Sequence, residues 1–125
     1  MRIANAGLIV KDLEAARGFF EDYFGAEVHA RYDNDATGYR SYIMRFDEGA
    51  KLELICKPGI IDVEKTVNDT GFIHLCMKAE SAERFEEILA KAKEDGYEIL
   101  YEPATVGGTE FRAIMFEDNI LEVCY

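Results

Sequence analysis

Four polar residues occupy matching places in the two halves of this 125-residue chain. Asn5 is separated from His74 by the same 69 residues that separate Glu53 from Glu122. One imidazole, two carboxylates and one carboxamide offer the nitrogen and oxygen ligands that suit Zn²⁺, Ni²⁺, Co²⁺, Mn²⁺ or Fe²⁺. The pattern predicts one shared site that could hold a divalent cation. The alternative is four unrelated, half-exposed strand residues.

Each of the four residues interrupts a short apolar segment that is typical of a β-strand. Alternate side chains of a strand share a face, so Glu53 points away from the face of Leu52 and Leu54. If helices cover the apolar faces and the two sheets curl toward one another, the four polar side chains converge in one concave site.

The elements that position these residues follow the order strand, helix and three strands, twice over. Asp12 and Ser81 are expected N-caps of two helices that end at Gly25 and Gly96. The expected strands span residues 2–10, 26–31, 39–46, 51–56, 72–78, 97–101, 110–116 and 120–124, with turns that include Gly107-Gly108 and Asp118-Asn119. The predicted fold is α+β, with two paired βαβββ modules whose curled mixed sheets enclose a cavity.

An internal duplication explains why the two halves look alike. Leu52 and Leu54 correspond to Leu121 and Val123 at the same separation of 69 residues. We expect a single domain over residues 1–125, with module one at about 1–56, a linker at about 57–69 and module two at about 70–125. Neither module could bury its sheet alone, so the modules must pair.

Composition excludes several kinds of partner. A net charge of −11, from 14 basic and 25 acidic residues, disfavours binding to nucleic acid or to an anionic membrane surface. No apolar run reaches the roughly 20 residues of a membrane span, and the N-terminus is charged too early for a signal peptide. Three widely spaced cysteines suggest neither a disulfide framework nor a zinc knuckle, so we expect a cytoplasmic protein.

The sequence resembles the vicinal-oxygen-chelate superfamily over essentially its whole length. That superfamily includes glyoxalase I (lactoylglutathione lyase), acyl-CoA epimerases, extradiol dioxygenases and bleomycin-resistance proteins. The resemblance implies a glyoxalase-like domain of paired βαβββ modules, most often in a homodimer. The segments that carry it are NAGLIVKDL at 5–13, LEL at 52–54, GFIHL at 71–75, GGT at 107–109 and DNILE at 118–122.

The resemblance also implies a ligand set. In the glyoxalase and epimerase branches the four metal ligands are His, Glu or Gln, His and Glu, and the last three correspond to Glu53, His74 and Glu122. Asn5 stands where the first His is expected. This difference fits a three-ligand site completed by water or the Asn oxygen, and it also fits a relative that has lost its metal.

The implied activity is that of a metal-dependent lyase or isomerase of the lactoylglutathione lyase type. A divalent ion (Ni, Zn, Co or Mn) that chelates two neighbouring substrate oxygens stabilises the enediolate formed when an α-proton leaves. Glu122 is the first candidate for the base and Glu53 the second, with glutathione as the implied co-substrate.

Two alternatives remain beside the lyase: an acyl-CoA epimerase, and a non-catalytic protein that sequesters a small molecule, as resistance proteins do. An extradiol dioxygenase is disfavoured because it needs two suitably placed histidines, and His29 is expected to be exposed or at a sheet edge. Arginine and aromatic side chains could also contribute to the site. Arg40, Arg45 and Arg112 are either surface charges or cations for an anionic thiol substrate, and Tyr39, Tyr42 and Phe72 could wall an apolar pocket.

Overall fold

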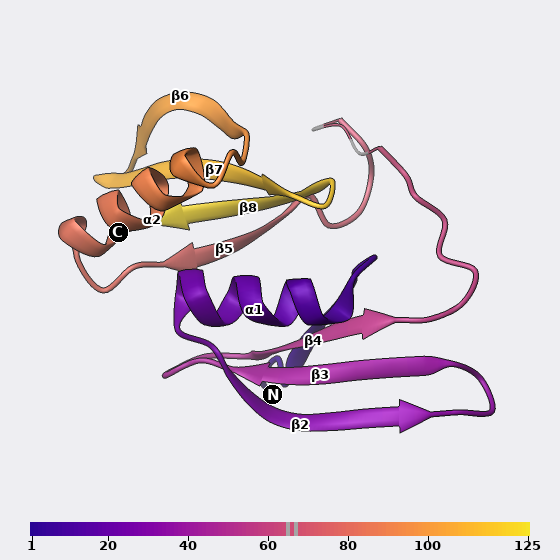
Figure 1. Cartoon of the computed structure of the whole chain (residues 1–125). Helices are drawn as coiled ribbons and strands as arrows, with labels where there is room; N and C mark the ends of the chain where they lie inside the picture. Colours follow the sequence, from indigo (N-terminus) through magenta and orange to yellow (C-terminus); the bar gives the residue numbers. More distant parts are fainter. Residues whose placement is uncertain (65, 67) are drawn as a thin grey trace. The chain divides into compact units, whose positions relative to one another are not determined.

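The computed structural model describes residues 1–64, 66 and 68–125, with the backbone alone at 101–104 and 106. The chain divides into two units, Met1–Asp62 and Val63–Tyr125. Each unit has the order strand, helix and three strands (Figure 1), so the predicted α+β fold of two βαβββ modules is confirmed. The cavity expected between the modules stays a prediction. Residues 65 and 67 of the expected linker lie outside the described residues.

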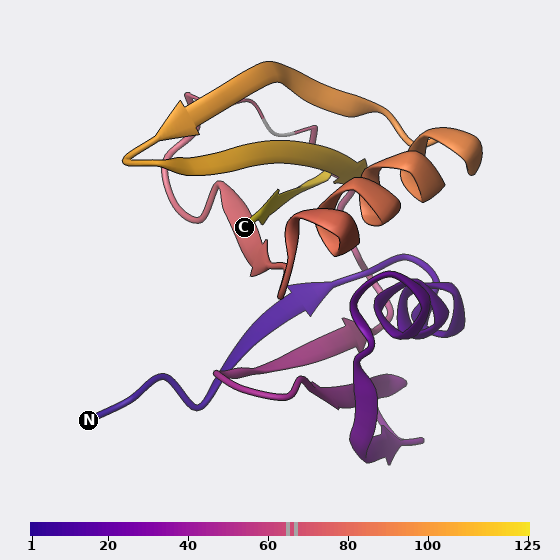
Figure 2. The ribbon, with the colours of Figure 1, turned by 90° about the vertical axis from the view of Figure 1, so that its left-hand side faces the viewer.

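The first unit is a four-stranded mixed sheet with one helix. Its strands are ordered β1-β4-β3-β2, with β1 parallel to β4 and the other pairs antiparallel. Leu52 and Leu54 of β4 and Phe20 of the helix are almost fully buried between the sheet and the helix. Figure 2 shows this helix seen nearly along its axis against the sheet. The elements are β1 (Asn5–Ile9), α1 (Leu13–Phe24), β2 (Glu27–Asn34), β3 (Tyr39–Arg45) and β4 (Lys51–Cys56).

The second unit repeats this architecture. Its strands are ordered β5-β8-β7-β6, and β5 runs parallel to β8. Phe85 of the helix and Leu121 of the central strand are both fully buried. The elements are β5 (His74–Lys78), α2 (Ala82–Glu94), β6 (Ile99–Val106), β7 (Thr109–Phe116) and β8 (Asn119–Cys124). In the described part of the chain, neither helix is long and apolar enough to cross a membrane.

The strand registers of the two units match residue for residue. Gly7 lies opposite Glu53 in the first unit, and Cys76 lies opposite Glu122 in the second. The other four pairs of β1 and β4 also map onto the pairs of β5 and β8 when 69 is added to each number. The separation that suggested a duplication in the sequence is therefore also the offset between the two paired strand sets.

Both predicted N-caps are present. The side chain of Asp12 accepts a hydrogen bond from the Ala15 amide at 2.9 Å, and that of Ser81 accepts from the Arg84 amide at 3.1 Å. Gly25 ends α1 in the left-handed region at φ 62°, as expected for a residue without a Cβ.

Several predicted boundaries need correction. The strand expected at 97–101 begins at Ile99 instead, because the Tyr97 amide donates to Ala92 O and so completes the end of α2. The turn between β7 and β8 is Glu117-Asp118, one residue earlier than expected, and both residues have positive φ. Two positive φ values are what a two-residue hairpin turn requires. The strands expected from residues 2 and 72 begin at Asn5 and His74.

Candidate functional site

The second unit brings two of the predicted site residues together. His74 begins β5, Glu122 lies in the middle of β8, and these two strands pair in parallel. His74 Nδ1 lies 3.3 Å from Glu122 Oε1. The carboxylate side chain is 16% exposed and the imidazole 39%, so both remain open to a small ligand.

The alternation of the strands explains this placement. Leu121 and Val123 flank Glu122 and are fully buried on the side of α2. Arg112, which pairs with Val123, places its guanidinium 5.9 Å from the ring of Phe85 in α2, which marks the same side. Glu122 therefore faces away from the helix, as the sequence predicted.

The first unit holds Asn5 and Glu53 on the equivalent face. Glu53 pairs with Gly7, and Asn5 lies two residues before Gly7, so both side chains face away from α1. Tyr39 Oη donates a hydrogen bond to Glu53 Oε1 at 2.9 Å. Desolvation and this hydrogen bond raise the pKa of Tyr39, so the phenol remains a donor to the carboxylate at neutral pH.

Asn5 has different neighbours from His74, the residue that corresponds to it in the second unit. It is exposed and pairs with Lys51, whose Nζ is 3.0 Å from His29 Nε2. His29 is exposed on β2, as expected.

The donor set of each unit fits a divalent cation. An imidazole nitrogen 3.3 Å from a carboxylate oxygen is a pair that a metal ion could bridge after small rotamer changes. Within the described residues there is no group of three or more His, Cys, Asp or Glu side chains placed to hold a metal. The predicted set takes two residues from each unit, so it stays a prediction.

Cys76 is the nearest thiol to this pair, because it lies opposite Glu122 in the sheet. Its Sγ is 3.6 Å from Cys124 Sγ. Desolvation and the hydrogen bond to Cys124 raise the pKa of Cys76 to about 12. The thiol therefore stays protonated at neutral pH and does not act as a nucleophile.

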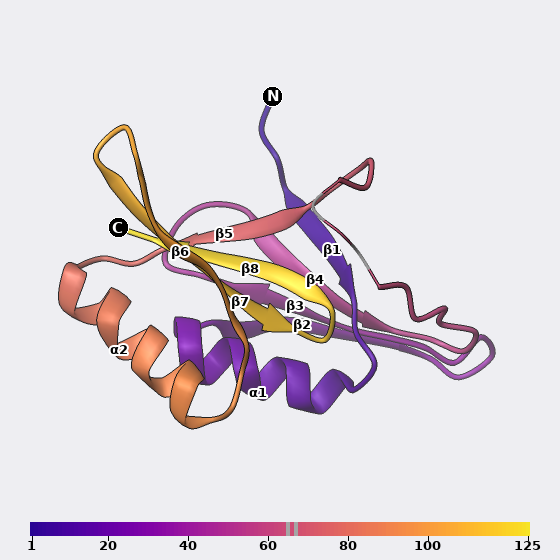
Figure 3. The same cartoon turned by 90° about the horizontal axis from the view of Figure 1, so that it is seen from above.

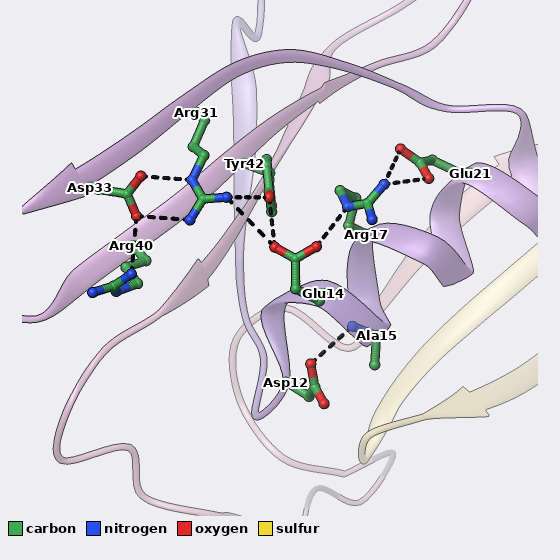
Figure 4. Close-up of polar contacts among 9 residues, drawn as sticks. All are labelled: Asp12, Glu14, Ala15, Arg17, Glu21, Arg31, Asp33, Arg40 and Tyr42. Carbon is green, nitrogen blue, oxygen red and sulfur yellow. Dashed lines mark hydrogen bonds and ion pairs between the residues drawn. The ribbon is translucent and has the colours of Figure 1, made fainter.

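A polar cluster centred on Tyr42 was not predicted from the sequence (Figure 4). Tyr42 Oη donates to Glu14 Oε1 at 2.6 Å and accepts from Arg31 at 2.7 Å. Arg17 bonds Glu14 and Glu21 along one face of α1. These contacts tie α1 to β2 and β3. Only the Glu14, Arg17 and Glu21 spacing, at three and four residues, was visible in the sequence.

The three arginines considered as substrate-binding cations are all paired with carboxylates of their own unit. The pairs are Arg40 with Asp33 and Asp35 at 3.6 and 3.5 Å, Arg45 with Glu27 at 3.0 Å, and Arg112 with Glu110 at 2.7 Å. Their charges are therefore balanced locally, which favours a structural role for all three, on the surface for Arg40 and Arg45 and against Phe85 for Arg112.

Replacing Tyr42 by phenylalanine is expected to raise the pKa of Glu14. The hydrogen bond from Tyr42 is the largest influence that lowers this pKa in the native chain, followed by the one from Arg17. A lowered native pKa stabilises the fold above the ordinary carboxyl pKa, and this contribution is lost as the pH falls through the native value. NMR titration of the Glu14 carboxyl checks the shift, with Tyr97→Phe in the other unit as control. An unchanged Glu14 pKa in Tyr42→Phe would show that the bond does not form in solution.

The comparisons with known proteins agree with this architecture. The family model of the Glyoxalase/Bleomycin resistance protein/Dioxygenase superfamily matches residues 2–119. The chain therefore belongs to that superfamily, as the sequence resemblance predicted. No curated protein matches the sequence.

Solved structures show the same fold at low sequence identity. A glyoxalase family protein from Bacillus cereus superposes with a TM-score of 0.85 at 18% identity, covering 99% of this chain and 93% of its own. A glyoxalase I mutant from Zea mays gives 0.76 at 21% identity, covering 97% of this chain and 44% of the maize chain. The trypanothione-dependent glyoxalase I of Leishmania major gives 0.77 at 19% identity, covering 98% and 85%. The superpositions show that these proteins share the fold of this chain. At such low identity, the activity of this chain must be inferred from its own residues.

Proposed function

We propose that this protein is a metal-dependent lyase or isomerase of the lactoylglutathione lyase type, with glutathione as co-substrate. The observation that carries the proposal is the His74–Glu122 pair, which lies on the face of its sheet away from α2 with 3.3 Å between Nδ1 and Oε1. Membership of the superfamily and the structural likeness to two glyoxalase I enzymes support it.

In this proposal Glu53, His74 and Glu122 hold a divalent cation (Ni, Zn, Co or Mn), with Asn5 or water as a further ligand. When bound, such an ion neutralises the negative charge that develops on two neighbouring substrate oxygens. A resident cation would also offset the two carboxylates in a chain whose net charge is −11.

The protein's own residues carry the proton in this scheme. Glu122 takes the α-proton of the hemithioacetal and returns it to the adjacent carbon, and the proton of the C1 hydroxyl passes to the oxygen on C2, which completes the isomerisation. His74 keeps the carboxylate oriented from one side. Tyr39 holds Glu53 by the 2.9 Å hydrogen bond, so Glu53 is less free to move than Glu122.

A second candidate function is sequestration of a small molecule without catalysis. Asn5 favours it, because a neutral carboxamide in place of an imidazole weakens a metal site. An acyl-CoA epimerase would use the same proton transfer on a different substrate.

We further propose a homodimer, which size-exclusion chromatography with light scattering tests directly.

Turnover of methylglyoxal with glutathione, followed after loading with each of the four metals, tests the proposed activity. Metal-dependent turnover supports the lyase. Tight binding of the hemithioacetal without turnover under any metal would favour the sequestering protein.

Asn5→His is expected to tighten metal binding by about tenfold, since it supplies an imidazole at the position that corresponds to His74. Isothermal titration with Ni²⁺ or Zn²⁺ measures the change. The wild-type chain has two histidines, His29 and His74. His29→Ala serves as the control and should leave the metal affinity unaltered. Equal affinities for Asn5→His and wild type would show that position 5 does not reach the metal.

A further inference from the structure

A pocket of about 410 Å³ lies at one end of the first unit, where the loop of the β2–β3 hairpin and the chain leaving β4 run side by side (Figure 3). None of its residues belongs to the predicted metal set. Its walls combine two tyrosine rings with a proline ring, and one lysine contributes the only formal charge. The lining residues are Tyr32, Asn34, Thr37, Tyr39, Lys57 and Pro58.

The pocket opens on the same face of the sheet as Glu53. Tyr42 faces α1, because its hydroxyl bonds Glu14, so Tyr39, three residues earlier on the same strand, faces the other way. Tyr32 pairs with Ser41 and shares that face. Tyr39 therefore belongs to both features: its ring lines the pocket while its hydroxyl holds Glu53 at 2.9 Å.

The walls of this pocket are held in place before any ligand arrives. The rings of Tyr32 and Tyr39 meet edge to face, with 5.8 Å between their centroids. Gly38, at φ 70°, lets the hairpin approach Pro58 so closely that a Cβ there would lie 2.7 Å from the proline Cγ. This open, ring-lined depression offers apolar faces on which a planar aromatic group can pack.

The hydrogen bonds around the pocket leave donors toward a ligand. Asn34 Oδ1 already accepts from the amides of Ala36 and Thr37 at 3.1 and 3.3 Å. Thr37 Oγ1 accepts from the Tyr39 amide and donates to Asn34 O. The Asn34 amide has one further hydrogen beyond its contact with Tyr32 Oη, and Lys57 has three. A ligand must therefore bring an acceptor, and the Lys57 ammonium favours an anionic one.

We propose that this pocket binds an aromatic carboxylate, whose flat aryl group packs against Tyr32, Tyr39 and Pro58 and whose carboxylate meets Lys57 and the Asn34 amide. The identification of this group as part of the substrate rests on the proposed function. In that case the substrate of the site near Glu53 is an aryl compound bearing a carboxylate.

Calorimetric titration with 2-naphthoate, on metal-free protein, tests the binding directly. Two matched probes separate the contributions, since 2-naphthylmethanol lacks the charge and cyclohexanecarboxylate lacks the aromatic ring. We expect 2-naphthoate to bind at least about tenfold more tightly than either probe. Tyr32→Ala should weaken it about tenfold, and Lys57→Gln should abolish the preference over 2-naphthylmethanol. Lys93→Gln on α2 makes the same charge change in the other unit and should have no effect.

Absence of 2-naphthoate binding, or binding that neither Tyr32→Ala nor Lys57→Gln alters, would overturn the proposal. Lys57 is exposed, so that variant remains informative even if Tyr32→Ala does not fold. His74→Ala should bind 2-naphthoate as the wild type does, which separates the pocket from the metal site. Where lyase activity is found, 4-carboxyphenylglyoxal should be preferred to methylglyoxal in kcat/KM, and Lys57→Gln should remove that preference.

Discussion

Glu122→Gln is expected to lower kcat/KM for methylglyoxal with glutathione by about 10²–10⁴-fold, the usual contribution of a positioned general base. Glutamine keeps the shape of the side chain and its place on β8 but cannot accept the α-proton. The loss should appear mainly in kcat, since the amide oxygen can still face the substrate. Steady-state kinetics on metal-loaded protein measures it.

Two comparisons make this result specific. Glu53→Gln should reduce activity less, because a carboxamide oxygen remains a ligand there and the proton transfer is assigned to Glu122. Glu94→Gln, at an exposed position of α2, removes the same charge and should leave the kinetics unchanged. If Glu122→Gln kept more than half of the wild-type kcat, Glu122 would not be the base.

Phe85→Ala is expected to reduce the free energy of unfolding by about 3–5 kcal/mol. Phe85 belongs to α2, and its fully buried ring lies 4.9 Å from the ring of Tyr125. Its removal leaves a cavity between the helix and β8. Urea unfolding followed by circular dichroism gives the change.

Phe20→Ala makes the matching change in the first unit, where the ring is equally buried. We expect a loss of similar size there. Ile61→Ala, at a side chain that is 82% exposed, should change stability by no more than about 0.5 kcal/mol. A loss below about 1 kcal/mol for both phenylalanine variants would contradict the packing of the helices on their sheets.

Local signals in the sequence predicted most of the fold. Asp12 and Ser81 were recognisable as N-caps because each acts on an amide only three residues away. The boundary at Tyr97 was wrong because its amide closes the helix five residues back, to Ala92, while the apolar pattern alone suggested a strand.

The candidate site was predicted only in part. Strand alternation and the repeat predicted that His74 and Glu122 lie on the face away from the helix, and the parallel pairing of β5 with β8 brings them to 3.3 Å. The bond from Tyr39 to Glu53 depends on the register of β3 against β4, which the sequence does not specify.

The sequence also predicted the positions of the aromatic residues only in part. Tyr39 and Tyr42 were both expected as pocket walls, but residues three apart on one strand face opposite sides. Tyr39 does line a pocket, whereas Tyr42 faces α1 and bonds Glu14. The expectation for Tyr42 was therefore wrong, and strand parity alone could have separated the two.

Metal content tests the proposed metal site most directly. Protein purified without added metal, then loaded with Ni²⁺, Zn²⁺, Co²⁺ or Mn²⁺ and dialysed, should retain about one ion per chain by elemental analysis. The double variant His74→Ala, Glu122→Ala should retain almost none, while His29→Ala should match the wild type. Uptake by the wild type no greater than that of the double variant would contradict the proposed metal site.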